Sequence, residues 1–319
     1  MSTLKKIASV AGCSMSTVSR ALNNCHDVST KTRERILEIA KDLGYFQRKK
    51  HIKKENRRKN EFNIAIICPE LESYYYANLV VCFSKHLSKN NHRTIIYNYA
   101  FDNKEQDRLV EMCENAFNID GIICLGQINN VVNYKKIAMM HASTQSDGNI
   151  VIFDNNAIGL DEAISSLGNQ KGKSVLFVGE KKTTLRERDF LSVVKNYSNI
   201  KSYRFISNKR FEEAGKEAAK YVLSCDKLPS LIICGYDEIA FGLIDALSKE
   251  GISVPKDVSV VGINDIPSAK YCFGGLSTIA FEIDEVCENV TKKLVEIIKS
   301  GTSTTANFYI PSKFIKRNT

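Results

Sequence analysis

Beyond residue 60, short apolar runs alternate with stretches that have the length and spacing of amphipathic helices. Alternation of this kind builds parallel sheets whose crossover helices cover both faces. Eight runs are too many for one small sheet, so the pattern predicts an α/β core of two lobes with a cleft between them. The runs are FNIAIICP, RTIIYNY, DGIICLG, NIVIFDN, KSVLFVGE, SYRFIS, SLIICGY and VSVVGIND, and the helical stretches lie near 77–90, 105–116, 185–197, 211–224 and 237–250.

The size and composition are those of a globular protein with two or three domains, since the chain has 319 residues of which 43% are hydrophobic. It contains no run of about 18 apolar residues that could span a membrane. Its first residues lack the apolar core of a secretory signal, so we expect a cytoplasmic protein without a membrane partner. The ten cysteines stand singly, with no Cys-x-x-Cys pair, which predicts buried reduced thiols.

Positive charge is concentrated at one end of the chain. Residues 1–60 hold 15 Lys and Arg against 5 Asp and Glu, a net charge of +10, and the remaining residues have a net charge of −1. A small basic module on a nearly neutral body indicates that the module binds a polyanion and that the body does not.

The spacing in the basic module predicts three short helices. Apolar residues recur at helical spacing over 4–11, Gly12 ends that helix, and Ser14 is placed to cap a second one. Ser29 caps a third helix that ends at Gly44. This is the plan of a helix-turn-helix, whose second helix can enter the major groove of DNA. Taken alone, STVSRALN is equally consistent with a solvated amphipathic helix. The inward positions of the second helix are Val18, Ala21 and Leu22, and its polar face carries Ser16, Ser19, Arg20 and Asn23.

These polar side chains suit DNA recognition. Arg20 can donate two hydrogen bonds to guanine O6 and N7, and Met15 and Ser16 would face base edges at the helix start. Thr17, Ser19 and Asn23 can hold phosphates and fix the register.

The segments LKKIASVAGCSMSTVSRALNN and VSTKTRERILEIAKDLGY resemble the DNA-binding head of the lac-repressor-type (LacI/GalR) transcription regulators over residues 4–45, and the resemblance as a whole covers residues 3 to about 317. It implies a head over 1–47, a basic hinge over 48–61 and a ligand-binding core over 62–319 that is similar to periplasmic sugar-binding proteins. It also implies a homodimer, with a tetramer as an open alternative, and operator DNA and a small sugar as partners. No catalytic activity, cofactor or metal is implied. By the resemblance, Met15, Ser16 and Arg20 read bases, while Thr17, Ser19, Asn23, Ser29 and Thr32 lie near the phosphate backbone.

The hinge departs from the family pattern. Residues 48–59 read RKKHIKKENRRK, with Gln47 and Arg48 where the family has Pro-Asn and Lys54 where it has a leucine that inserts into the minor groove. Ile52 could substitute for that leucine. The composition predicts binding mainly by phosphate neutralisation and a steep dependence on salt. The hinge residues expected to contribute are Lys49, Lys50, Ile52, Lys53 and Lys54.

The core is expected to divide into an N-lobe, about 62–154 with about 283–300, and a C-lobe, about 155–282 with the C-terminal segment. Ligands of such folds bind beyond the carboxyl ends of the strands. Carboxylates, an amide and a guanidinium with flanking rings suit a polyhydroxylated ligand. Asp237 is as well placed to cap a helix, and Asp265 to order its loop. The expected effector-binding residues are Tyr75, Tyr76, Asp154, Arg186, Tyr236, Asp237, Asn264 and Asp265. Two positions depart from the family pattern: Tyr236 replaces an asparagine, and Asp189, which is not one of these eight residues, replaces a glycine.

The segments SVVGINDIPSAKYCFGGLSTI and YIPSKFIKRNT most resemble the branch of the family that represses evolved-β-galactosidase genes, which implies a galactoside or galactose as effector. Two alternatives stay open: a regulator of the same fold that senses a purine or a phosphorylated co-regulator, and a sugar-binding protein without DNA function. GNQKGKS at 168–174 is one residue short of a phosphate-binding loop and precedes a strand. The five histidines show no spacing typical of a metal site or a catalytic nucleophile.

Overall fold

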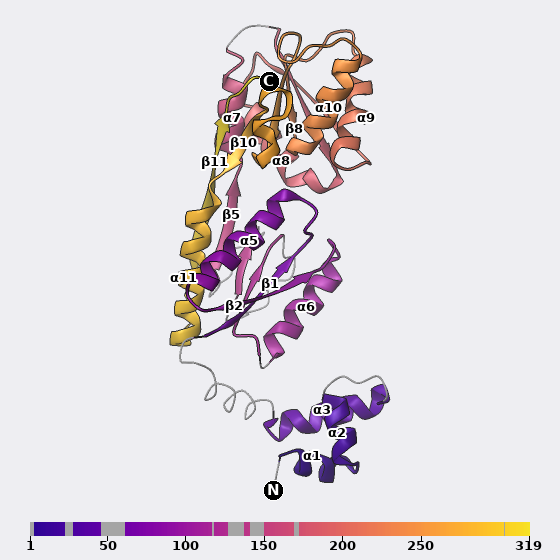
Figure 1. Ribbon diagram of the computed structural model, residues 1–319, viewed down its shortest axis with the longest axis vertical. Helices are drawn as coiled ribbons and strands as arrows, with labels where there is room; N and C mark the ends of the chain where they lie inside the picture. Colours follow the sequence, from indigo (N-terminus) through magenta and orange to yellow (C-terminus); the bar gives the residue numbers. More distant parts are fainter. Residues whose placement is uncertain are drawn as a thin grey trace.

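The computed structural model describes residues 3–22, 28–45, 61–116, 118–126, 137–140, 150–168, 172–302 and 304–319. It has a helical head and a two-lobed α/β core (Figure 1). The predicted fold class is therefore confirmed, and each of the eight predicted strands is present.

The head consists of α1 (Thr3–Ala11), α2 (Met15–Leu22) and α3 (Thr30–Asp42). Gly12 has a φ of 63°, which allows the tight turn between α1 and α2. Ser14 Oγ accepts a hydrogen bond from the Thr17 amide at 3.1 Å, and Ser29 Oγ accepts one from the Thr32 amide at 3.3 Å. Both predicted caps are thus confirmed. The helices enclose one apolar cluster of Ile7, Ala8, Ala11, Val18, Ala21, Val28, Ile36 and Ala40.

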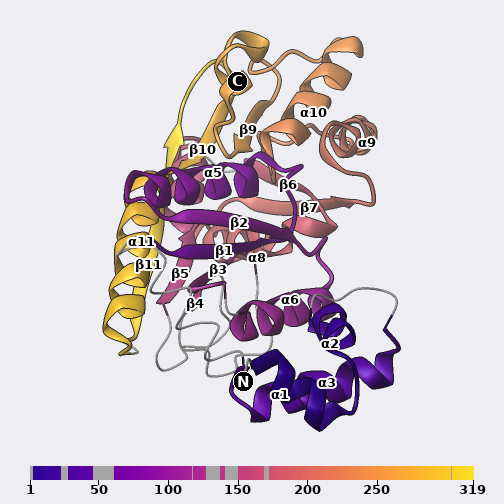
Figure 2. The same ribbon diagram turned by 60° about the horizontal axis from the view of Figure 1, so that its bottom comes forward.

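The N-lobe is a parallel sheet covered by helices on both faces. The core residues of β1, Ile64 to Cys68, are fully buried, as expected for a strand with a helix layer above and below it. Helices α5 and α11 pack on one face and α6 on the other (Figure 2). Its elements are β1 (Asn63–Cys68), α5 (Tyr74–Lys89), β2 (Arg93–Asn98), α6 (Asn103–Asn115), β3 (Gly121–Cys124), β4 (Ile137–Met140), β5 (Ile150–Asn155), α11 (Ile283–Ser300) and the first part of β11 (Ala306–Ile315).

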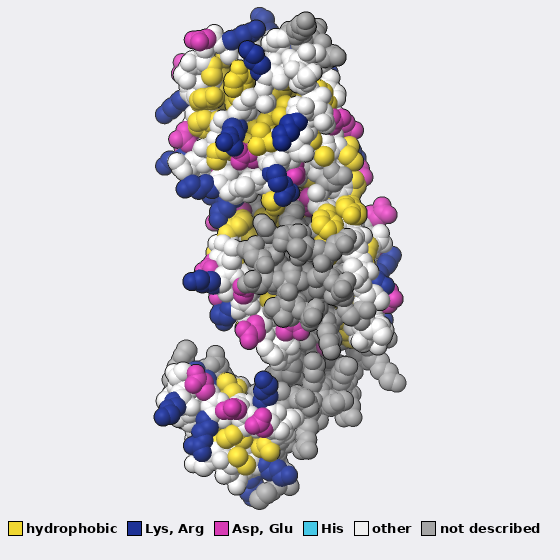
Figure 3. Space-filling model, turned by 180° about the vertical axis from the view of Figure 1, so that it is seen from behind, with side chains coloured by type: hydrophobic (Ala, Val, Ile, Leu, Met, Phe, Trp, Pro, Cys, Tyr) yellow, Lys and Arg dark blue, Asp and Glu magenta, His cyan; other side chains and the backbone are white. Residues whose placement is uncertain are grey.

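The C-lobe repeats this three-layer plan, with α9 and α10 on one face of its sheet and α7 and α8 on the other. Strand β7 forms the edge, so most of its residues are exposed. Apolar side chains also show on the surface of this lobe when it is seen from behind (Figure 3). Its elements are α7 (Ala157–Ser165), β6 (Ser174–Glu180), η1 (Lys181–Thr183), α8 (Thr184–Val194), β7 (Lys201–Ser207), α9 (Phe211–Leu223), β8 (Leu231–Cys234), α10 (Asp237–Lys249), β9 (Ser259–Ile263), η2 (Pro267–Lys270), η3 (Cys272–Gly274) and β10 (Ser277–Phe281).

The chain passes between the lobes three times. It leaves the N-lobe between β5 and α7, returns between β10 and α11, and crosses again within β11. Residues 306–311 of β11 pair parallel to β5, and residues 312–315 pair antiparallel to β10. The strands therefore run in one continuous order, β2-β1-β3-β4-β5-β11-β10-β9-β8-β6-β7.

Five of the described α-helices and β-strands were not predicted from the sequence, namely α7, α11, β4, β10 and β11, and neither were the short helices η1, η2 and η3. The apolar residues of α11 are interleaved with charged ones, and β11 alternates exposed and buried residues over much of its length. Among the described residues, no helix is long and apolar enough to cross a membrane.

Candidate functional site

The outer face of α2 carries the side chains expected to contact DNA. Met15, Ser16 and Arg20 are exposed, while Thr17 and Ser19 are half-buried. The Ser14 hydroxyl lies 2.7 Å from the Ser16 hydroxyl and 2.8 Å from that of Thr17. These hydroxyls gather at the amino end of α2, whose first turn holds no acidic residue, so the end of the helix is suited to a phosphate.

The remaining predicted DNA contacts lie in two places. Ser29 and Thr32 cap the amino end of α3, with 2.8 Å between their hydroxyl oxygens. Asn23 and the hinge residues Lys49, Lys50, Ile52, Lys53 and Lys54 lie outside the described residues.

A small cavity of about 50 Å³ lies between the lobes, where the strands of both sheets end. The N-lobe contributes α5 and the end of β5, and the C-lobe contributes α8 and the segment after β8. Five of the predicted effector residues meet there: Tyr75, Tyr76, Asp154, Arg186 and Tyr236. The other lining residues, which sequence reasoning did not select, are Ser73, Asn156, Lys182, Leu185, Arg188 and Asp189.

Arg186 forms the centre of this site. Its buried guanidinium donates to the carbonyl of Gly235 and, at 2.7 Å, to Asn264 Oδ1, which brings a sixth predicted residue to the site. It also lies 4.8 Å from the ring centroid of Tyr236 and 5.3 Å from that of Tyr75. Because Tyr75 belongs to the N-lobe and Tyr236 to the C-lobe, the cation contacts both. A desolvated cation over a ring contributes about 2 kcal/mol.

Several buried polar atoms at the site have no hydrogen-bond partner within the described protein. They are the Ser73 hydroxyl, Asn156 Oδ1 and Asn264 Nδ2. Asn156 uses its other polar atom, Nδ2, to donate to Asp189 at 2.7 Å. Buried polar groups are usually satisfied, so a cluster of such atoms around one cavity indicates a place for a hydroxylated ligand or ordered water.

The phenols at the cavity stay protonated. Burial raises the pKa of Tyr75, with a further contribution from the carboxylate of Asp154 beside it, and burial likewise raises the pKa of Tyr76. Burial raises the pKa of Tyr236 to about 12. All three hydroxyls can therefore donate hydrogen bonds to a ligand at neutral pH.

The structure does not bring Asp237 and Asp265 to the cavity. Asp237 is fully buried at the start of α10, where its carboxylate accepts hydrogen bonds from the Ile266 amide and the Thr278 hydroxyl. Asp265 instead pairs with Arg317 at 2.5 Å. Both contacts fasten the loop after β9, in agreement with the structural alternative for Asp265. The alternative for Asp237 was wrong, because its carboxylate binds this loop and does not cap α10, whose first flanking residue is Tyr236.

A second set of charged residues joins the lobes beside the cavity. Arg210, at the start of α9 in the C-lobe, donates to both carboxylate oxygens of Glu70 in the N-lobe, at 2.8 and 2.9 Å. It also contacts Glu72 at 3.1 Å and Glu180 at 3.2 Å. We call these four residues the latch. Glu180 is the last residue of a predicted strand, a signal that could have found it, but no spacing in the sequence connects Arg210 with Glu70.

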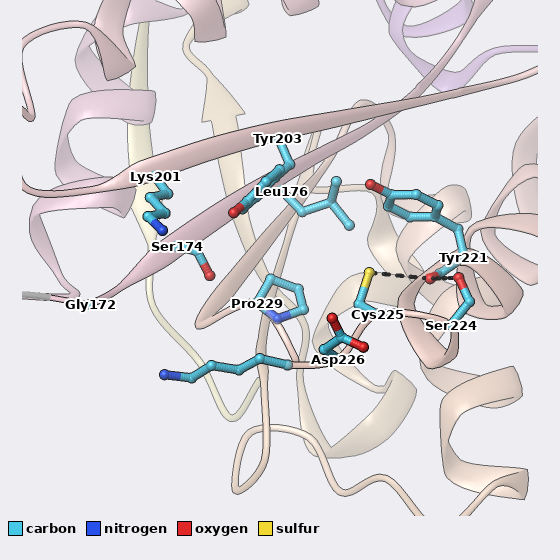
Figure 4. Close-up of a pocket in the computed structure, with 11 residues that line it drawn as sticks. Gly172, Ser174, Leu176, Lys201, Tyr203, Tyr221, Ser224, Cys225, Asp226 and Pro229 are labelled. Atoms are coloured by element: carbon cyan, nitrogen blue, oxygen red, sulfur yellow. Dashed lines mark hydrogen bonds between the residues drawn. The ribbon is translucent and has the colours of Figure 1, made fainter.

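A larger cavity of about 550 Å³ lies in the C-lobe, away from the cleft (Figure 4). It is formed where β6 and β7 begin and where α9 ends, so it lies at the amino ends of these strands. Lys201, Tyr203 and Tyr221 are among its lining residues. Ligands of open α/β sheets bind beyond the opposite, carboxyl ends. The inter-lobe cavity, though smaller, is therefore the better candidate for the effector.

Comparison with known proteins agrees with this architecture. Residues 3–47 match the family described as bacterial regulatory proteins, lacI family, and residues 164–319 match the periplasmic binding protein-like domain. The HTH-type transcriptional regulator GanR of Bacillus subtilis (strain 168) is 27% identical, with 99% of each chain covered.

Two solved structures have the same fold. The lac repressor dimer bound to operator and the anti-inducer ONPF has a TM-score of 0.67 and 18% identity, over 99% of this chain and 98% of the other. The complex of the transcriptional regulator CelR with cellobiose has a TM-score of 0.64 and 17% identity, over 100% and 99%.

A helix-turn-helix head on a two-lobed core of the periplasmic-binding-protein type defines a class of ligand-responsive, DNA-binding transcription regulators. Within that class, the head is that of the LacI/GalR family, which residues 3–47 match, and the chain is similar over its whole length to a regulator with a helix-turn-helix. The chain is a DNA-binding transcriptional repressor with an effector domain of the sugar-binding type, and it is not an enzyme. The alternative of a sugar-binding protein without DNA function is thereby excluded.

Proposed function

We propose that the chain binds a pseudo-palindromic operator as a dimer, in the cytoplasm, and that a small sugar in the inter-lobe cavity releases it. A galactoside or galactose is the effector we propose, on the resemblance to the branch that represses evolved-β-galactosidase genes. The observation that carries the sugar proposal is the cluster of buried polar atoms without partners beside Arg186.

The chemistry of the cavity suits a sugar ring. The hydroxyls of a sugar can donate to Asp154 and accept from the phenol of Tyr75. The C–H face of the ring can pack on the aromatic ring of Tyr76 or Tyr236. A purine would also stack on these rings, but it offers fewer hydroxyl donors for the carboxylate.

The proposal requires that the lobes part before the ligand enters. Sites for small molecules usually have about 300–1,000 Å³, whereas the cavity holds about 50 Å³. The contacts between the lobes here include the latch, Lys182 on the ring of Phe101 at 3.8 Å and Arg186 on the ring of Tyr75 at 5.3 Å. All of them must separate on opening.

Calorimetry of the full chain with galactose, lactose and guanine tests the effector. We expect binding heat with galactose or lactose, and its loss in Arg186→Met. Arg204→Met is the matched control, because Arg204 pairs with Glu187 inside the C-lobe, away from the cavity. Binding heat with guanine, and none with galactose or lactose, would instead favour the alternative of a regulator that senses a purine.

The dimer is proposed to place two α2 helices in successive major grooves, as paired heads of this kind do. Val81 on α5 and Ile96 on β2 are exposed apolar side chains of the N-lobe that a partner subunit could cover. Sedimentation of the full chain should give a dimer, or a tetramer under the open alternative. A monomer at micromolar concentration that still binds operator tightly would contradict the proposal.

Operator binding can be tested by gel shift with the DNA upstream of the gene. We expect effector to weaken operator binding by a coupling of about 1–3 kcal/mol. Replacing four hinge lysines should flatten the dependence of affinity on salt, since each contact with a phosphate releases counterions. The substitutions are Lys49→Gln, Lys50→Gln, Lys53→Gln and Lys54→Gln, and an unchanged slope would rule out this role for the hinge.

A further inference from the structure

Three side chains with metal-binding atoms meet where α5 packs against α11. Cys82 and His86 lie one turn apart on α5, and Asp284 lies in the first turn of α11. One donor atom from each of Cys82, His86 and Asp284 lies within 4.8 Å of the other two. Cys287, further along α11, packs in the same buried cluster as Cys82.

The distances between these atoms match the edges of a tetrahedral site. Zinc binds sulfur at about 2.3 Å and nitrogen or oxygen at about 2.0 Å, so a regular tetrahedron has edges of about 3.5 Å between sulfur and oxygen and about 3.3 Å between nitrogen and oxygen. Cys82 Sγ lies 3.6 Å from Asp284 Oδ1, and His86 Nε2 lies 3.2 Å from the same oxygen. The two edges that meet at Asp284 Oδ1 thus have the length expected for a tetrahedral site.

Burial and accessibility fit a site that an ion can enter. Cys82, His86 and Cys287 are buried, whereas the side chain of Asp284 is 63% exposed and opens the cluster to solvent. Both cysteines are free thiols. The Lys85 ammonium lies 3.1 Å from Asp284 Oδ1, and the pKa of Asp284 is lowered to about 2 by its hydrogen bonds to Lys85, then to His86. Lys85 thus forms an ion pair with the carboxylate that a metal ion would bind.

We propose that Cys82, His86 and Asp284 bind one divalent transition-metal ion of the zinc type, with a water in the fourth position. A thiolate, an imidazole and a carboxylate are ligands that such an ion prefers in tetrahedral sites, and the thiolate and imidazole disfavour magnesium and calcium. The spacing of the histidines alone gave no sign of this site, because Asp284 is 198 residues from His86 in the sequence.

The site lies at a passage between the lobes. Asp284 is the second residue of α11, directly after the chain crosses from β10. Phe281, the last residue of β10, lies with its ring centroid 5.3 Å from that of Tyr75, which lines the effector cavity. A bound ion would join the start of α11 to α5 and thereby restrain one of the three passages that must move when the lobes part.

Titration of the reduced full chain with Co²⁺ tests the proposal, because thiolate ligands give cobalt an intense charge-transfer band and tetrahedral geometry gives strong visible absorption. We expect one Co²⁺ per chain. His86→Gln and Cys82→Ser should weaken binding at least about tenfold, since disturbing even an outer partner of a ligand costs 10–100-fold. Cys82→Ser should also abolish the charge-transfer band, because it removes the thiolate ligand. Cys113→Ser is the matched control, because Cys113 is another buried helical cysteine of the N-lobe, and it should leave the spectrum unchanged.

A second variant tests the site without removing a ligand. Lys85→Gln should bind Co²⁺ about two- to fivefold more tightly, because the ion then no longer competes with an exposed ion pair. Lys85 is 53% exposed, so this substitution should not affect folding. Absence of the thiolate band, equal affinity in Cys82→Ser and wild type, or weaker binding by Lys85→Gln would each overturn the proposal. None of these results depends on which sugar binds in the cavity.

Discussion

Replacing Arg210 with methionine is expected to shift the core toward an open arrangement of its lobes. In the latch, the guanidinium holds Glu70 of the N-lobe by two hydrogen bonds and Glu180 of the C-lobe at 3.2 Å. Both carboxylates are nearly inaccessible to solvent, with side chains 8% and 2% exposed. Methionine keeps much of the length of the side chain but leaves two buried carboxylates without a cation while the lobes are closed.

The magnitude follows from the burial of the latch. Removing one partner of a fully buried ion pair costs about 3–5 kcal/mol. Because the Arg210 side chain is 31% exposed, solvent screens part of this interaction, and we reduce the cost to about 1–3 kcal/mol. Only the part of this cost that comes from Glu70 is specific to the closed form, since opening returns Glu70 to water whereas Glu180 lies in the same lobe as Arg210. The ratio of closed to open molecules should therefore fall by up to about 150-fold.

The absence of tryptophan from the chain provides the assay. Phe101→Trp places a single emitter under Lys182, at a contact between the lobes. With Arg210→Met added, opening should expose the indole, so that its emission shifts to the red and acrylamide quenches it more strongly. Arg204→Met is the control, since its ion pair lies within the C-lobe. If Arg210→Met leaves emission and quenching unchanged, the latch does not hold the lobes together.

Three further substitutions test other parts of the molecule. Arg20→Ala should cost about 1–3 kcal/mol at one base pair, and an unchanged ratio of operator to random-duplex affinity in gel shifts would show that Arg20 reads no base. Burial raises the pKa of Asp237 to about 7 from 3.8. Between these pH values the folded chain keeps a proton that the unfolded chain has lost. The free energy of unfolding should therefore fall by up to about 4 kcal/mol as the pH rises through this range. Asp237→Asn should remove this fall in urea denaturation at a series of pH values, and an equal fall in the variant would assign it to other groups. Asp102→Ala removes the carboxylate that caps α6 by accepting from the amides of Lys104 and Glu105, and it should lower the free energy of unfolding by about 1 kcal/mol; no loss would argue against the cap.

Local rules were sufficient for the head and for most of the core strands. Ser14 and Ser29 cap their helices as expected because capping depends on atoms three residues apart. The strands of the core stood out because burial on both faces requires nearly continuous apolar runs. Strand β11 did not stand out, since it is covered less completely and its residues alternate between exposed and buried.

The sites could be predicted only in part, because they depend on contacts between distant segments. Arg186 was recognisable from the family pattern, whereas its bond to Asn264 spans 78 residues and the bond from Arg210 to Glu70 spans 140. Asp237 shows the opposite limit. Its position at the start of α10 was clear, but only the structure shows the Thr278 hydroxyl and the Ile266 amide that its carboxylate binds.

The three passages of the chain between the lobes also limit how regulators of this build can diversify. The head corresponds to one uninterrupted stretch of sequence, so a single recombination point transfers a DNA specificity to another receptor. Neither lobe is formed by one continuous stretch of sequence, and the single strand β11 contributes residues to the sheets of both lobes. Exchange of one lobe between genes would need three simultaneous junctions, and new ligand specificities should therefore arise by substitutions within the cleft.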